Sequence, residues 1–286
     1  MDYNLCDINT VKRLLSKYGF TFSKALGQNF LIDEEVCPAM ARALGADRET
    51  GVLEIGPGIG VLTKELCKCA GKVCSIELDK RLYPLLGETL ADYDNFELIE
   101  GDVMKLDLKS LIDEHFRGMK EVKVCANLPY YITSPVIMLL LESRLPVSEI
   151  VVMVQKEAGE RLCAKAGSRE AGAVSIATQY FGEAEVLFGV GRESFMPSPK
   201  VDSSVIRIKL HGTPEYSLEE EKLFFRLVKG AFSQRRKTLV NSLSSTLSVS
   251  KDTLLSSLSS LGLSPTCRAE NLTMEDFKGL YSALNQ

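Results

Sequence analysis

The residues with the clearest chemical potential are three alternating glycines and two acids that follow them. Gly56, Gly58 and Gly60 come after a short apolar segment, and glycines at a strand-to-helix turn let the backbone approach a ligand closely. Glu77 ends the next apolar segment, where a carboxylate can accept hydrogen bonds from both hydroxyls of a ribose. Asp102 follows the third apolar segment and can accept a hydrogen bond from an adenine amine. Together they predict an adenosine-containing ligand across the carboxyl ends of three strands.

The glycine loop alone is weak support for a nucleotide site, because a tight strand-to-helix turn uses the same residues. Its Gly-x-Gly-x-Gly spacing differs from the Gly-x-Gly-x-x-Gly of dinucleotide-binding enzymes. A nicotinamide-dependent oxidoreductase is one alternative, but no Tyr-x-x-x-Lys pair for hydride transfer lies near these residues.

A second motif, the tetrapeptide Asn127-Leu128-Pro129-Tyr130, follows the fourth expected strand. An adenine amine is a poor nucleophile because its lone pair is delocalised into the ring. The Asn127 side-chain oxygen and the Leu128 carbonyl can accept the two amine hydrogens and direct the lone pair at an electrophile. Pro129 fixes the turn, and Tyr130 can stack on the base, which contributes about 1–3 kcal/mol. The motif therefore predicts methyl transfer to an adenine amine, whereas a plain Asn-Pro turn with a packed Tyr is the structural alternative.

The segments that position these motifs alternate between strand and helix patterns. Strands are expected at residues 52–55, 72–77, 96–100, 122–126 and 149–154, and helices at residues 9–19, 60–69, 81–90 and 136–142. Such repeated units predict an α/β fold with a mostly parallel sheet. Two more strands, at residues 185–190 and 201–210, are expected to add an antiparallel pair at the end of the sheet.

The chain changes character after a linker pattern at residues 211–214. Beyond it, helices are expected at residues 218–232, 237–247, 251–261 and 274–284. We therefore expect a domain at residues 1–212 that carries the site and a small all-α domain at residues 213–286.

These motifs, in this order, resemble those of the ribosomal RNA adenine dimethylases over almost the whole chain. The matching stretches are Gln28-Asn29-Phe30-Leu31, residues 54–60, residues 127–130, residues 195–201 and Gln234-Arg235-Arg236-Lys237. The resemblance implies a Rossmann-like class I methyltransferase with a seven-stranded sheet. It also implies S-adenosylmethionine as cofactor and dimethylation of N6 of two adjacent adenosines near the 3′ end of small-subunit rRNA.

The resemblance carries residue roles with it. Cofactor contacts are expected from Asn29, Leu31, Gly56, Gly58, Glu77, Asp102 and Asn127. Tyr130 and Phe195 are expected to stack on either side of the target base, although by composition alone Phe195 is an ordinary loop residue. The implied partner is the assembling small ribosomal subunit, on which the protein is expected to act as a cytoplasmic monomer with no membrane partner.

Two related functions remain as alternatives. One is a methyltransferase that modifies a single large-subunit rRNA adenosine, against which Leu128 and the stretch Arg268-Ala269-Glu270 favour the small-subunit enzyme. The other is an RNA-binding ribosome-assembly factor with little catalytic role. The intact tetrapeptide disfavours this alternative.

The charge distribution is compatible with RNA even though the 286-residue chain has a formal net charge of -4. Residues 77–121 hold twelve acids and six bases, whereas residues 8–32 and 222–237 contain bases and no acid. The first basic run holds Lys12, Arg13, Lys17 and Lys24. The second holds the expected RNA-binding residues Lys222, Arg226, Lys229, Arg235, Arg236 and Lys237. Such runs are often only solvated faces, but two of them around an acidic centre favour a phosphate-binding rim.

The cysteines and apolar segments exclude other classes. Eight Cys without a secretory pattern indicate thiols in a reducing compartment. Cys67 and Cys69 fall on nearly opposite faces of a helix and neither His is near them in sequence, so no metal site is expected. The longest apolar run, residues 136–141, is too short to span a bilayer.

Overall fold

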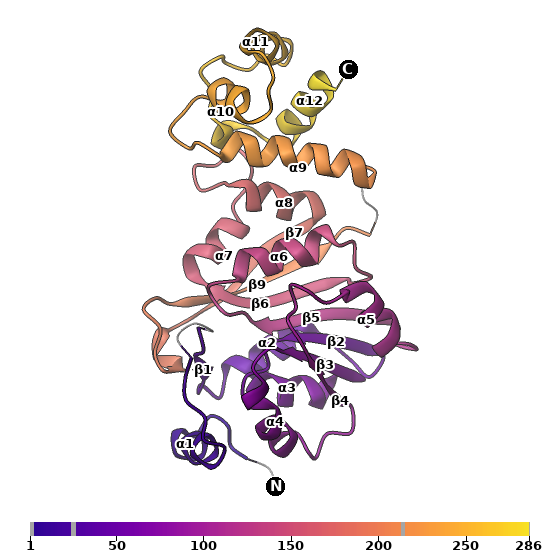
Figure 1. Cartoon of the computed structure of the whole chain (residues 1–286), viewed down its shortest axis with the longest axis vertical. Coiled ribbons are helices and arrows are strands. Elements are labelled where there is room, and N and C mark those ends of the chain that lie inside the picture. Colours follow the sequence, from indigo (N-terminus) through magenta and orange to yellow (C-terminus); the bar gives the residue numbers. More distant parts are fainter. Residues whose placement is uncertain (1–2, 24–26, 213–214, 286) are drawn as a thin grey trace. The chain divides into compact units, whose positions relative to one another are not determined.

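A seven-stranded sheet forms the framework of the site. The computed structural model describes residues 3–23, 27–212 and 215–285. The strands lie side by side in the order β4-β3-β2-β5-β6-β9-β7 (Figure 1). Their bounds are β2 Thr50–Ile55, β3 Lys72–Glu77, β4 Phe96–Glu100, β5 Glu121–Asn127, β6 Glu149–Gln155, β7 Gly182–Val190 and β9 Ser203–Leu210.

The sheet is mostly parallel, as the sequence predicts. Strands β4, β3, β2, β5 and β6 pair in parallel, and β9 pairs antiparallel with β6, placing Ser203 opposite Gln155. The two strands expected at the end of the sheet are indeed the last two in its order, with β9 next to β6. All six residues of β2 are buried, as expected for a central parallel strand covered on both faces.

Helices alternate with the strands of this sheet and make up most of the chain after β9. Their bounds in the first part of the chain are α1 Ile8–Lys17, α2 Val36–Leu44, α3 Val61–Cys69, α4 Tyr83–Thr89, α5 Leu108–His115 and α6 Thr133–Glu142. The later helices are α7 Lys156–Leu162, α8 Ala173–Phe181, α9 Leu218–Phe232, α10 Leu239–Thr246, α11 Lys251–Ser260 and α12 Met274–Leu284. No helix among the described residues is long and apolar enough to cross a membrane.

A separate two-stranded sheet joins two segments that are far apart in sequence. Strand β1 (Phe30–Leu31) pairs antiparallel with β8 (Phe195–Met196), so that Leu31 lies opposite Phe195. The sequence analysis did not predict this pairing, because two-residue strands show no periodicity. It brings the Gln28–Leu31 motif to the loop that carries Phe195.

The chain divides into two compact units. One comprises residues 1–159 and 185–210, and the other comprises residues 160–184 and 211–286. Residues 160–184, which contain α8, thus group with the C-terminal helices, although the sequence analysis placed them in the first domain. The sequence analysis predicted no element at α8, whose β-branched Val174, Ile176 and Thr178 lower its helix propensity.

Candidate functional site

A cavity of about 250 Å³ opens at the carboxyl ends of the parallel strands. All of the expected cofactor and base-contacting residues line it: Asn29, Leu31, Gly56, Gly58, Glu77, Asp102, Asn127, Leu128, Pro129, Tyr130 and Phe195. The expected RNA-binding residues of α9 and the turn after it do not line it. Residues that were grouped by motif in the sequence therefore converge in space on one cavity.

The glycine loop between β2 and α3 has the conformation that its residues require. Gly56 and Gly58 have φ values of 69° and 59°, in the left-handed region that favours glycine. The Gly56 N–H donates to the Ile76 carbonyl at 2.9 Å, which fixes the loop against β3. A Cβ on Gly58 would lie 3.3 Å from the Phe30 ring, so the loop also fits closely against β1. The glycines are needed for the shape of the cavity wall.

Glu77 ends β3 and presents its carboxylate at the cavity. The side chain is buried, and Oε1 accepts a hydrogen bond from the Asp79 N–H at 2.7 Å. Burial raises the pKa of Glu77 to about 7, although the N–H groups of Asp79 and Gly58 favour the ionised form. A ligand that donates hydroxyl hydrogens to this carboxylate would favour the ionised form further.

Glu54 is a second buried carboxylate at the cavity, and the sequence analysis did not single it out. It lies on β2 and accepts hydrogen bonds from the Thr63 hydroxyl at 2.7 Å and the Ser75 hydroxyl at 2.5 Å. Burial raises the pKa of Glu54 to about 7. Its position among Val52, Leu53 and Ile55, two residues before Gly56, was the available signal, because an acid in a buried strand requires partners.

Asp102 lies in the turn that follows β4. Its Oδ1 accepts a hydrogen bond from the Met104 N–H at 3.0 Å, and its Oδ2 lies 3.5 Å from the Lys105 ammonium. The turn holds the Asp102 carboxylate at the cavity wall, where the strand order predicts the adenine end of a nucleoside.

The segment before β1 closes the cavity on another side. The Asn29 amide donates to the Gly27 carbonyl at 3.1 Å, and the Gln28 amide donates to Asp79 at 2.7 Å. Asp79 in turn pairs with Arg81 at 2.6 Å. The Gln28–Leu31 motif is therefore tied to the turn that follows Glu77.

The tetrapeptide begins at the last residue of β5. The Leu128 N–H donates to the Met153 carbonyl at 3.1 Å, which continues the pairing of β5 with β6. No donor among the described residues engages the Leu128 carbonyl. The Tyr130 hydroxyl lies 2.7 Å from the hydroxyl of Ser203, the first residue of β9, and this contact fixes the ring. The turn thus has an amide, a carbonyl and an aromatic ring at one side of the cavity.

Phe195 borders the same cavity but is only 4% exposed. It belongs to a buried cluster that includes Leu31, Val190 and Val205. The Phe195 side chain therefore packs in the core and also forms part of the cavity wall. Its stacking on a target base remains a prediction.

Three exposed apolar side chains at the cavity were missed by the sequence analysis. Leu78, Met104 and Tyr131 line the cavity and are 46%, 41% and 52% exposed. Each lies one or two residues after a motif residue: Leu78 follows Glu77, Met104 comes two residues after Asp102, and Tyr131 follows Tyr130. Adjacency to those motifs was the only signal in the sequence.

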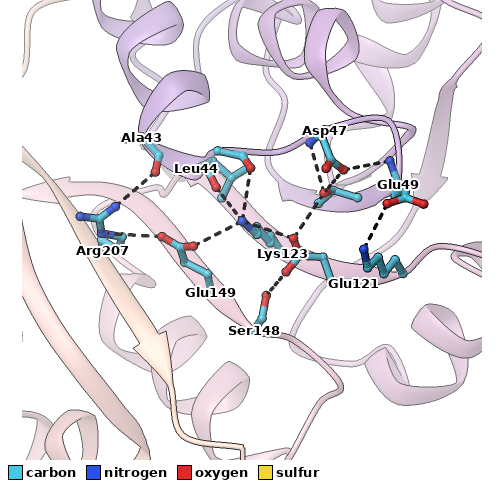
Figure 2. A network of polar contacts seen from close by, with 12 residues as sticks. Ala43, Leu44, Asp47, Glu49, Glu121, Lys123, Ser148, Glu149 and Arg207 are labelled. Carbon is cyan, nitrogen blue, oxygen red and sulfur yellow. Dashed lines mark hydrogen bonds and ion pairs between the residues drawn. The ribbon is translucent and has the colours of Figure 1, made fainter.

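A buried polar network fixes β5 at the end opposite to Asn127. The Lys123 ammonium donates to the Leu44 carbonyl at 2.9 Å and lies 3.5 Å from both Glu121 and Glu149 (Figure 2). Arg207 of β9 reaches the Ala43 carbonyl at 3.4 Å. The network joins the end of α2 to three strands, and Cys37 of the same helix lines the cavity.

The expected RNA-binding residues differ in how they are engaged. Lys222 pairs with Glu219 at 2.8 Å, and Arg235 donates to the Arg169 carbonyl at 3.3 Å. The side chains of the whole set, Lys222, Arg226, Lys229, Arg235, Arg236 and Lys237, are exposed.

The basic run near the N-terminus is also divided. Lys12 and Arg13 are exposed on α1, whereas Lys17 pairs with Glu88 at 2.6 Å. Lys24 lies outside the described residues.

One group of potential metal ligands lies away from the cavity. Atoms of Cys74, Glu97 and His115 lie within 4.8 Å of one another. The Glu97 carboxylate is already engaged by Lys72 at 2.8 Å and His115 at 2.9 Å. The sequence analysis considered only the pair Cys67 and Cys69, and it did not foresee that the fold brings Cys74 and His115 together.

Comparisons with known proteins identify similar chains. The family model described as ribosomal RNA adenine dimethylase matches residues 19–286. The ribosomal RNA small subunit methyltransferase A of Geobacillus thermodenitrificans (strain NG80-2) is 46% identical over 276 residues, which cover 96% of this chain and 94% of that protein. The protein of the same name from Geobacillus sp. (strain WCH70) is 44% identical over 287 residues, which cover 99% of this chain and 99% of that protein.

Solved structures show the same fold. A dimethyladenosine transferase from Plasmodium falciparum matches with a TM-score of 0.75 and 28% identity, covering 90% of this chain and 97% of that chain. The 23S rRNA methyltransferase ErmE matches with a TM-score of 0.68 and 24% identity, covering 90% of this chain and 100% of that chain.

Proposed function

Because the chain belongs to the ribosomal RNA adenine dimethylase family, we propose that it dimethylates N6 of two adjacent adenosines near the 3′ end of small-subunit rRNA. The proposed methyl donor is S-adenosylmethionine. One observation carries the proposal: the Asn127–Tyr130 turn opens into the same cavity as the glycine loop, Glu77 and Asp102. A nucleoside site and an amine-orienting turn in one cavity are what methyl transfer to an adenine requires.

The residues of the cavity fit the proposed cofactor. The glycine loop offers close backbone approach, Glu77 offers a carboxylate for the ribose hydroxyls, and Asp102 offers an acceptor for the adenine amine. Asn29 and Leu31 supply the wall next to β1. The buried Glu54, which accepts hydrogen bonds from two hydroxyls, supports the strand directly beneath the loop. When bound, S-adenosylmethionine supplies an electrophilic methyl group on a sulfonium.

The tetrapeptide orients the target amine. The Asn127 side-chain oxygen and the Leu128 carbonyl accept its two hydrogens, which withdraws the lone pair from the ring and directs it to the methyl group. Because β5 pairs with β6 up to this turn, the backbone that carries both acceptors is held in place before the substrate arrives. Such orientation can lower a barrier by roughly 7–11 kcal/mol.

The target base is expected to leave its stack and enter the cavity, at a cost of a few kcal/mol. Stacking on Tyr130 and Phe195 would offset that cost. The hydrogen bond between Tyr130 and Ser203 supports this role, because it holds the ring before the base arrives. The exposed lysine and arginine side chains of the C-terminal unit would bind rRNA phosphates. The substrate places the reaction in the cytoplasm, where ribosomal subunits assemble.

One experiment tests the proposed function. The protein is incubated with methyl-labelled S-adenosylmethionine and unmethylated small ribosomal subunits, and the labelled nucleotides are mapped by mass spectrometry. Dimethyladenosine at two adjacent positions near the 3′ end of the small-subunit rRNA is expected. A parallel reaction with protein-free large-subunit rRNA is the control. Label on a single large-subunit adenosine, or no label on either RNA, would overturn the proposal.

A further inference from the structure

The loop between α7 and α8 lies against the turn between α9 and α10, within one compact unit. The contact is made by Arg235, whose Nη2 donates to the backbone carbonyl of Arg169 at 3.3 Å. The sequence analysis gave no role to residues 163–172. The structure places this loop beside the Gln234–Lys237 stretch, whose basic side chains are expected to bind RNA.

The α7–α8 loop is held in one conformation by its own hydrogen bonds. The Gln179 side chain bridges it, donating to the Ala164 carbonyl at 2.7 Å and accepting from the Ala166 N–H at 3.3 Å. The Ser175 hydroxyl accepts from the Gly172 N–H at 2.9 Å at the other end. Side chains on such a loop are presented without a large cost of ordering the backbone.

The two segments together carry more basic than acidic side chains, because Glu170 is the one acid beside Lys165 and Arg169 in residues 163–172 and the Gln234–Lys237 stretch has none. Lys165 and Arg169 are exposed on the α7–α8 loop, and Arg236 and Lys237 are exposed on the turn that contacts this loop through Arg235. Within the described part of the chain, no acid engages any of these four side chains. Lys222 differs, because Glu219 pairs with it at 2.8 Å. The basic side chains of this unit that no acid engages therefore include those at the junction of the two segments.

We infer that the α7–α8 loop is a second phosphate-contacting segment for rRNA, with Lys165 and Arg169 as its contacts. This inference rests on the proposed function and names a further part of its RNA surface. An RNA backbone fits the junction because phosphates recur along a strand and can be met by several cations that are fixed relative to one another.

Arg235 has a separate part in this surface. One of its N–H groups is committed to the Arg169 carbonyl, so we treat it as a positioning residue that joins the two segments. Its planar guanidinium has five donors, and a lysine cannot reproduce that geometry. Arg236 lies next to it in sequence without this contact and provides a matched control.

The first test measures binding of the full-length protein to unmethylated small ribosomal subunits over a series of KCl concentrations. The variant Lys165→Gln with Arg169→Gln should lower the salt slope by about 1 for each residue. The salt slope is the change in the logarithm of affinity with the logarithm of salt concentration. Each unit of slope therefore changes the affinity about tenfold between 1 M and 0.1 M salt. Lys251→Gln, which removes an exposed charge from α11, is the control. Wild-type binding by the double variant, or an equal loss per charge in the control, would overturn the inference.

The second test separates positioning from charge. Arg235→Lys keeps the charge but should weaken binding and speed amide hydrogen exchange in residues 163–172, whereas Arg236→Lys should do neither. Unchanged exchange in Arg235→Lys would remove the positioning role. Methyl transfer by the wild-type protein is measured on the same subunits, since its absence would contradict the proposed function itself. If the wild type methylates and the Lys165 and Arg169 variant binds normally, only the inference about the loop fails.

Discussion

The cavity of the α/β unit and the basic surface of the helical unit hold their functional residues in different ways. In the cavity, Glu77 and Asn127 end parallel strands, and Glu54 lies buried within another. On the basic surface, Arg236 and Lys237 are exposed, and their side chains have no acidic partner among the described residues. The acidic residues Glu54 and Glu77 of the cavity are fixed and buried by the sheet, whereas the basic residues are exposed on a helix and the turn after it.

This difference teaches where each kind of effect should be sought. A change in the cavity should alter chemistry, cofactor affinity or pH dependence, since buried groups interact strongly and are little screened. A change on the basic surface should act through phosphate binding and depend on salt.

The largest effect is expected from Asn127→Ala. Loss of the side-chain oxygen removes one of two acceptors for the target amine, and the rate of methyl transfer should fall by about 10³-fold or more, on the scale of a lost oriented hydrogen-bond partner. Single-turnover assays on small subunits measure the rate, and urea unfolding measures stability, which should be nearly unchanged because Asn127 is not fully buried. Near-wild-type activity would contradict the mechanism.

Arg235→Ala combined with Arg236→Ala should weaken RNA binding by about 100-fold at 0.1 M salt and lower the salt slope by about 2. Binding to small subunits and to S-adenosylmethionine would be measured separately by fluorescence and calorimetry. Cofactor affinity should not change, since neither residue lines the cavity. An equal loss of both affinities would break the division between the two regions.

Glu54→Gln should stabilise the cofactor-free protein at high pH. Burial raises the pKa of Glu54 to about 7, above its value in an unfolded chain. The folded state therefore binds the proton more tightly, and stability is lost as pH rises from about 4.5 to about 7. The neutral amide avoids that loss, which is on the order of 2–3 kcal/mol. Urea unfolding at pH 5 and pH 8 should show the gain only at pH 8, and a gain of equal size at both would rule out the ionisation argument.

The smallest effect is expected in the pH dependence of cofactor affinity. Because burial raises the pKa of Glu77 to about 7 and the ribose hydroxyls require the carboxylate, affinity should rise about tenfold from pH 6 to pH 8. Calorimetry would measure this rise, and Glu77→Gln should flatten it. Glu54→Gln is the control, because Glu54 titrates over the same range. A rise that persists in Glu77→Gln would assign the dependence to another group.

The parts of the fold that could be predicted from the sequence are those that depend on the pattern of neighbouring residues. Apolar segments that end in Glu77 and Asn127 were predictable because buried parallel strands are continuous apolar runs, and the carboxyl ends of such strands meet at one edge. The glycine loop was predictable because only glycine adopts its backbone conformation without strain. With these two rules, most of the cavity follows from the order of motifs.

The remaining features depend on contacts between distant segments. Pairing of Leu31 with Phe195 leaves no periodic trace in either segment. The proximity of Arg235 to Arg169, and of Cys74 to His115, arises only when helices and strands have packed. Helix α8 was missed because tertiary packing overrides the strand preference of its β-branched residues.

The pairing of β1 with β8 also bears on how the protein forms on a translating ribosome. Leu31 emerges long before its partner Phe195, which follows 164 positions later (195 − 31). At about 5–20 residues per second, the N-terminal segment waits for roughly 10–30 s before this wall of the cavity can close. A nascent chain that ends before residue 195 should therefore contain the central parallel strands and the glycine loop but lack a finished cofactor pocket. The enzyme becomes competent only after more than two thirds of its chain has been made.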